Sequence, residues 1–127
     1  MPPSGRQGAA GPLVQVFGTD DSPATRAALR FFKERRLAAQ LIDIRRKPMA
    51  PAELRRFVER LGARALVDEG SRVWRDAGLA YLTMDDGDLA ARLLADQRLL
   101  RLPLVRIGSD VAAGRDEARW RILLSRA

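Results

Sequence analysis

Residues 17–23 encode the end of a strand, a turn and the start of a helix, in the order Phe17-Gly18-Thr19-Asp20-Asp21-Ser22-Pro23. Residues 13–17 are rich in β-formers and stop at a glycine, which predicts a strand. Ser22 followed by Pro23 is a strong helix start, with serine as N-cap and proline in the first turn, and we expect this helix to reach about Leu37. A nucleophilic cysteine often occupies such a turn, but here the position is held by Ser22.

The length and composition predict one folded domain. The chain has 127 residues, of which 46% are hydrophobic, and this is enough for a core. No apolar run approaches the ~20 residues that cross a membrane. Residues 1–11 are expected to form a flexible tail without the apolar segment of a secretory signal, and residues 12–127 the domain. A cytoplasmic location is therefore the expectation.

The chain contains neither cysteine nor histidine. Disulfides, reactive thiolates, iron–sulfur clusters and Ser-His-Asp triads are therefore excluded. A transition-metal site would have to use carboxylates alone, which such metals do not favour. We expect no metal and no resident cofactor.

The formal net charge is +7, and only two of the 23 basic residues, Lys33 and Lys47, are lysine. This charge attracts polyanions. The basic loop Arg45-Arg46-Lys47 could contact DNA or RNA, but few aromatic residues are present to stack on bases. A nucleic-acid partner is therefore disfavoured.

The rest of the pattern alternates between strand and helix periodicity. Residues 40–44 form a second strand, and the strand–helix–strand order predicts a parallel pair. A helical block is expected over about residues 48–98, with Leu89, Leu93 and Leu94 of its last helix facing inward. The remaining expected elements are a strand over residues 102–107, a tight turn at 108–110, a short strand at 111–113 and a helix over 117–126.

This order resembles the thioredoxin fold with a helical insertion, and particular residues sharpen the resemblance to the arsenate reductase/Spx family, the ArsC-like proteins. The resemblance covers about residues 13–124. It rests on the order and spacing of several short motifs: Phe17-Gly18, Arg26-Ala27-Ala28, Asp43-Ile44-Arg45, Pro51-Ala52-Glu53-Leu54-Arg55, Leu61-Gly62, Trp74-Arg75, Leu104-Val105 and Ala113-Gly114.

The resemblance places Ser22 on the family's catalytic cysteine and Thr25 on the second cysteine of Spx-type members. It implies that Pro103 follows a cis peptide bond and shapes the pocket wall beside the active-site helix. The arginine that precedes this proline in the family is Leu102 here, and the neighbouring Arg101 would face the other way. Arg72 and Arg75 lie in the region of another anion-binding arginine of the family. With Arg101 and the free N–H groups near Ala24 and Thr25 they could form an anion pocket, and the plainer alternative is that they are solvated surface arginines.

Three interpretations of Ser22 follow. It is best explained as a plain N-cap. It could instead be a remnant active-site residue that meets a ligand at a positive helix end, or it could stand where the natural gene encodes cysteine or selenocysteine. A hydroxyl ionises far above neutral pH and has no redox couple, so Ser22 cannot do the work of a thiol.

Two functional classes remain. The first is an oxidoreductase by descent, whose missing thiol would come from glutathione bound beside Ser22 and Pro103. The second is a redox-inactive adaptor similar to Spx-type proteins, which bind RNA polymerase, with a partner surface at Arg26, Arg30 and the loop 45–47. The adjacent Asp20-Asp21 would repel an oxyanion, which counts against an arsenate pocket. We expect a monomer.

Overall fold

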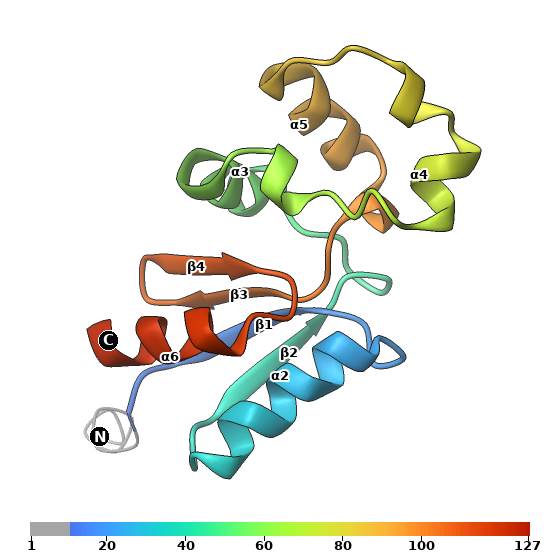
Figure 1. Cartoon of the computed structure of the whole chain (residues 1–127). Helices are drawn as coiled ribbons and strands as arrows, with labels where there is room; N and C mark the ends of the chain where they lie inside the picture. The colour runs from blue at the N-terminus through green and yellow to red at the C-terminus, as the bar shows by residue number, and fades with distance from the viewer. Residues whose placement is uncertain (1–10) are drawn as a thin grey trace.

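The computed structural model describes residues 11–127, and most of the tail expected at residues 1–11 lies outside the described residues. Its centre is a four-stranded sheet in the order β2-β1-β3-β4. The two halves meet where β1 pairs parallel with β2 and antiparallel with β3 (Figure 1). The strands are β1 (Val14–Gly18), β2 (Ala39–Asp43), β3 (Leu104–Ile107) and β4 (Asp110–Ala113).

Helices cover both faces of this sheet (Figure 1). One face carries α2 (Pro23–Glu34) and α6 (Glu117–Arg126). The other carries the insertion, which holds α3 (Pro51–Leu61), α4 (Arg72–Asp76) and α5 (Asp86–Ala95), joined by the 3₁₀ turns η1 (Arg64–Leu66), η2 (Leu79–Tyr81) and η3 (Gln97–Leu99). The predicted α/β class, a thioredoxin-like fold with a helical insertion between its β-α-β and β-β-α halves, is confirmed.

Two hydrophobic clusters lie on opposite sides of the sheet because successive strand residues point to opposite faces. Val16 of β1 belongs to the cluster under α2 and α6, where the Phe31 and Trp120 rings are 5.2 Å apart. Phe17 belongs to the cluster under the insertion, where its ring lies 5.8 Å from that of Phe57. A single strand therefore anchors both helical layers.

The inward placement predicted for Leu94 is wrong. Leu89 and Leu93 are 1% and 0% exposed, whereas Leu94 is 40% exposed. Each helical residue is rotated by about 100° from the previous one. The buried stripe of α5 follows the four-residue step from Leu89 to Leu93, with Ala90 partly buried beside it. Leu94 therefore lies at the edge of the stripe.

The junction between β1 and α2 has the predicted capping geometry. The Ser22 hydroxyl accepts a hydrogen bond of 3.1 Å from the amide of Thr25, and Pro23 occupies the first turn. Thr25 is fully buried against Gly18. A Cβ at position 18 would overlap the Thr25 side chain, so the glycine allows the helix to start directly behind the strand end.

The segment before β3 ties the insertion to the sheet. The amide of Arg101 donates to the carbonyl of Leu66 at 2.7 Å, and Asp68 donates to Leu99 at 2.9 Å. The peptide bond between Leu102 and Pro103 is cis, as the resemblance implies. The Pro103 carbonyl accepts from the Gly114 amide at 2.9 Å. The insertion and the sheet therefore meet at a backbone-paired joint.

The cap at Ser22 predicts a specific stability change. Ser22→Ala removes the acceptor for the Thr25 amide and is expected to lower the free energy of unfolding by about 1 kcal/mol. Ser22→Asn keeps a capping oxygen and is expected to retain most of the stability. Urea unfolding followed by circular dichroism measures both. Equal losses for the two variants, or none for alanine, would contradict a capping role.

Candidate functional site

A cleft of about 470 Å³ lies between the loops at one end of the sheet and the last part of the insertion. One wall is formed by Thr19 and Asp21, in the turn between β1 and α2. The second follows β2 and contributes Ile44, Arg45 and Pro48. Residues 94–98 and Leu102 complete it. The lining is an apolar surface with charged groups, which is the usual make-up of a small-molecule site.

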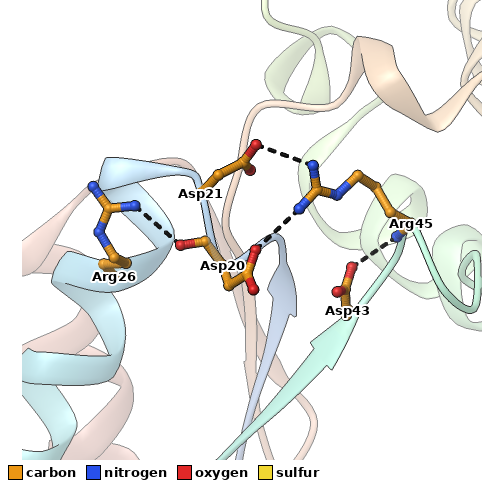
Figure 2. Close-up of polar contacts among 5 residues, drawn as sticks. All are labelled: Asp20, Asp21, Arg26, Asp43 and Arg45. Carbon is orange, nitrogen blue, oxygen red and sulfur yellow. Dashed lines mark hydrogen bonds and ion pairs between the residues drawn. The ribbon is translucent and has the colours of Figure 1, made fainter.

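Arg45 connects the two walls (Figure 2). Its guanidinium donates to the carboxylates of Asp20 and Asp21, each at 3.0 Å. Its backbone amide donates to Asp43 at 3.0 Å, and Arg26 of α2 donates to the Asp20 carbonyl at 3.0 Å. The groups are exposed, so these ion pairs contribute little to overall stability. Their effect is to orient the turn that precedes Ser22.

A second arginine–carboxylate pair lies across the cleft. Arg98 donates to Asp96 through Nε at 2.9 Å and Nη2 at 2.8 Å, a bidentate contact. This hydrogen bonding lowers the pKa of the Asp96 carboxyl below its usual value. The pKa of Asp21 is also lowered, chiefly by a side-chain hydrogen bond from Thr19 and further by Arg45. Both carboxylates of the cleft are therefore charged at neutral pH. Each offsets the positive charge of one of the two arginines.

Gln97 holds the insertion side of the cleft in place. Its amide oxygen accepts from the Met49 backbone amide at 2.8 Å, and its amide nitrogen donates to the Met49 carbonyl at 2.9 Å. This pair of bonds imitates one step of a strand ladder. It joins the loop after β2 to the turn after α5, and these two segments carry Arg45 and Arg98.

The structure places the predicted site residues in two separate regions. Ser22, Thr25 and Pro103 lie at the junction next to the cleft, although none of them lines it. The Thr25 hydroxyl is buried and has no hydrogen-bond partner among the described residues. Pro103 is buried next to Leu102, which does line the cleft.

Arg72 and Arg75 are positioned elsewhere, on α4 in the insertion. Arg75 donates to the carbonyl of Gly70 at 2.6 Å, within its own segment, and neither arginine lines the cleft. Arg101 is also outside the cleft lining, and its aliphatic chain packs on Gly114. The structure does not bring these three arginines to the cleft beside Ser22.

Sequence reasoning missed Asp96, Gln97 and Arg98 as cleft residues. Asp96 and Arg98 lie at the start of η3, which is too short to show a periodic pattern, and their position depends on how η3 packs. The sequence places Arg45 in a basic loop and in the Asp43-Ile44-Arg45 motif, and neither predicts its ion pairs. The acidic pair Asp20-Asp21 in the preceding turn is the sequence feature that could indicate a partner for Arg45.

Residues 11–127 contain no group of three or more acidic, histidine or cysteine side chains placed to hold a metal ion. Among the same residues, no helix has the length and apolar character needed to cross a bilayer.

Comparison with known proteins places this fold and cleft in a family. Residues 17–123 match the family model of the ArsC family. Proteins named arsenate reductase from two strains of Neisseria meningitidis are 29% identical over 108 residues, which is 82% of this chain and 92% of theirs.

Solved structures agree in fold. An arsenate reductase from Vibrio cholerae superimposes with a TM-score of 0.78 at 19% identity, over 90% of this chain and 99% of that one. An arsenate reductase related protein from Brucella melitensis gives 0.65 at 14% identity, over 86% and 92%. The family match extends from the end of β1 into α6 and includes the cleft. The chain belongs to the ArsC family.

Proposed function

We propose that this protein is a redox-inactive member of the ArsC family that acts by binding. The observation that carries the proposal is the state of Ser22. The resemblance places Ser22 on the family's cysteine, and the Ser22 hydroxyl caps α2 by accepting from the Thr25 amide. Because the chain has no cysteine, it has no thiolate to attack an oxyanion or to form a disulfide.

The charges of the cleft support the same proposal. Arg45 and Arg98 are its two cations; Arg45 is paired with Asp20 and Asp21, and Arg98 is paired with Asp96. An arsenate-like oxyanion would have to displace Asp20 and Asp21 from Arg45 or Asp96 from Arg98. Like charges at short range oppose such an approach. The cleft is therefore better suited to an uncharged or zwitterionic organic molecule than to a small oxyanion.

The alternative enzyme function requires a thiol from outside the chain. Relatives named arsenate reductase favour it, and a cleft of about 470 Å³ lies within the range that accepts small organic ligands. Two glutathione thiols would supply two electrons and leave as one disulfide, while arsenate would become arsenite and release one oxygen as water. This chain would contribute only binding and orientation.

An arsenate reduction assay with glutathione and glutaredoxin tests the two functions. We expect no turnover above the protein-free rate for the parent chain, because the chain itself supplies no thiol nucleophile. Ser22→Cys introduces the missing thiol, and Ser109→Cys in the exposed turn between β3 and β4 is the matched control for a non-specific thiol.

Turnover by the parent chain would contradict the proposal. Turnover by Ser22→Cys, with none by the parent or Ser109→Cys, would show that the cleft accepts the substrate and lacks only its nucleophile.

The charge balance of the cleft has its own test. Arg98→Ala is expected to raise the pKa of Asp96 toward the ordinary aspartate value, because the Arg98 hydrogen bond is the main cause of its depression. The folded-state pKa of Asp96 is lowered, so the pair stabilises the protein above the ordinary pKa, and this contribution is lost as pH falls through the depressed value. NMR titration of the carboxyl carbons measures the shift. Arg92→Ala removes another exposed arginine and should leave the pKa of Asp96 unchanged. An unaltered Asp96 pKa in Arg98→Ala would contradict the pairing of Arg98 with Asp96.

An Spx-like adaptor that contacts RNA polymerase is the second candidate. It is favoured by Arg46 and Lys47, which are exposed and make no ion pair within residues 11–127. Charge reversal of both residues is expected to abolish retention of purified RNA polymerase on the immobilised protein. Arg55→Glu with Arg60→Glu on α3 gives the same charge change elsewhere. The surface would be excluded if charge reversal at Arg46 and Lys47 left retention of RNA polymerase unchanged. It would also be excluded if Arg55→Glu with Arg60→Glu reduced retention equally.

A further inference from the structure

The net charge of the protein is concentrated on one helical layer. Residues 23–36 contain five basic and one acidic side chain, and residues 115–126 contain four basic and two acidic, so together they carry +6 of the chain's +7. These segments are α2, α6 and the residues that flank them. The opposite layer and both ends of the sheet are therefore nearly neutral as a whole.

The two basic helices lie on the same face of the sheet and share one hydrophobic cluster (Figure 1). A hollow of about 140 Å³ lies between them. Its polar lining is formed by Arg30, Glu34, Arg35, Arg115 and Glu117, and the Phe31 ring contributes an apolar part. The hollow is too small for most organic ligands, but it has room for the end of a single side chain.

Arg35 is held in position at this hollow. Its guanidinium carbon lies 3.6 Å from the centroid of the Phe31 ring, and its Nη1 donates to the Phe31 carbonyl at 3.0 Å. A guanidinium that stacks on an aromatic ring keeps its outer N–H groups free to donate. Arg35 is therefore a pre-oriented donor.

The other two arginines of the hollow are weakly engaged. Arg30 makes no ion pair within residues 11–127, and Arg115 lies 3.9 Å from Glu117, at the limit of an ion pair. By contrast, Arg45 at the cleft meets two carboxylates at 3.0 Å each. The hollow therefore contains cationic groups that can bind a carboxylate from another molecule.

We propose that the α2–α6 hollow is a docking site for an acidic protein segment, one carboxylate of which enters between Arg30, Arg35 and Arg115. Planar guanidinium groups pair with carboxylates through two parallel hydrogen bonds. The net positive charge of the surrounding helices steers an acidic partner to this face and speeds its association.

The details of the face favour a protein over a nucleic acid. Glu34 and Glu117 line the hollow and repel a continuous phosphate chain, whereas a folded partner can place its carboxylates between them. Phe31, Phe32 and Trp120, the aromatic rings of this layer, are buried and cannot stack on bases. Ile122 is 45% exposed on α6 and offers an apolar contact on the same layer.

This inference goes beyond the redox-inactive function and does not depend on the cleft. The cleft lies beside the insertion, whereas the hollow lies on the helical layer across the sheet. Arsenate turnover by the parent chain would overturn the proposed function and leave the docking site standing. Failure to bind an acidic peptide would overturn the docking site and leave the proposed function standing.

Fluorescence anisotropy with a labelled glutamate-rich peptide that carries one leucine tests the docking site. The parent protein should bind it in low salt and more weakly as salt rises. Arg30→Glu with Arg115→Glu is expected to weaken binding at least about tenfold. Arg55→Glu with Arg60→Glu on α3 has the same charge change and should weaken it far less. Amide shifts in the NMR spectrum of the parent locate the peptide without any variant.

Several results would overturn the proposal. Equal weakening by the two charge-reversed variants would mean general attraction and no site. Peptide-induced shifts confined to α3 or to the loop 45–47 would place the contact elsewhere. Tighter binding of duplex DNA, or of phosphatidylserine vesicles, than of the peptide at equal salt would identify a phosphate-bearing partner and exclude the acidic protein.

Discussion

The contact between Gly18 and Thr25, locked by the Ser22 cap, is the constraint on which the site depends. Thr25 is fully buried against a strand residue that has no side chain, and its amide is held by Ser22. This contact brings the start of α2 directly behind the end of β1, and β1 in turn anchors both hydrophobic clusters. The same turn that could present a nucleophile in this fold is therefore required for packing, and it persists in a chain that has no thiol.

The distribution of charge separates two surfaces with different chemistry. At the cleft, Arg45 and Arg98 are each paired with carboxylates, and the lowered pKa values of Asp21 and Asp96 keep those carboxylates ionised. Across the sheet, the arginines between α2 and α6 outnumber their acidic neighbours, and Arg30 has no ion-pair partner within residues 11–127. A paired arginine stabilises a local conformation, whereas an unpaired one attracts partners. The proposed binding role rests on this contrast between the two surfaces.

Much of the fold could be predicted because its elements have local signals. The Ser22-Pro23 start, the glycines at positions 18 and 62 and the 3,4 spacing of buried residues define helices and strands through short-range sterics and burial. Leu94 escaped prediction because a leucine at the edge of a buried stripe has the same sequence signal as one inside it. The sequence could not predict that Arg72 and Arg75 lie away from the cleft, because an exposed helix carries no local signal for the element it packs beside.

The amino-acid sequence by itself determined the order of elements, the class of fold and the absence of thiol chemistry, because periodicity, capping and residue type act over a few positions of the chain. Only the tertiary structure decided which charges neutralise each other. Arg45 is paired with Asp20 and Asp21 although 25 and 24 residues separate them. Arg30 of α2 and Arg115, which precedes α6, line one hollow without such close pairing. Long, flexible arginine side chains take partners according to where the folded backbone places them, and that placement depends on how the two layers pack on β1.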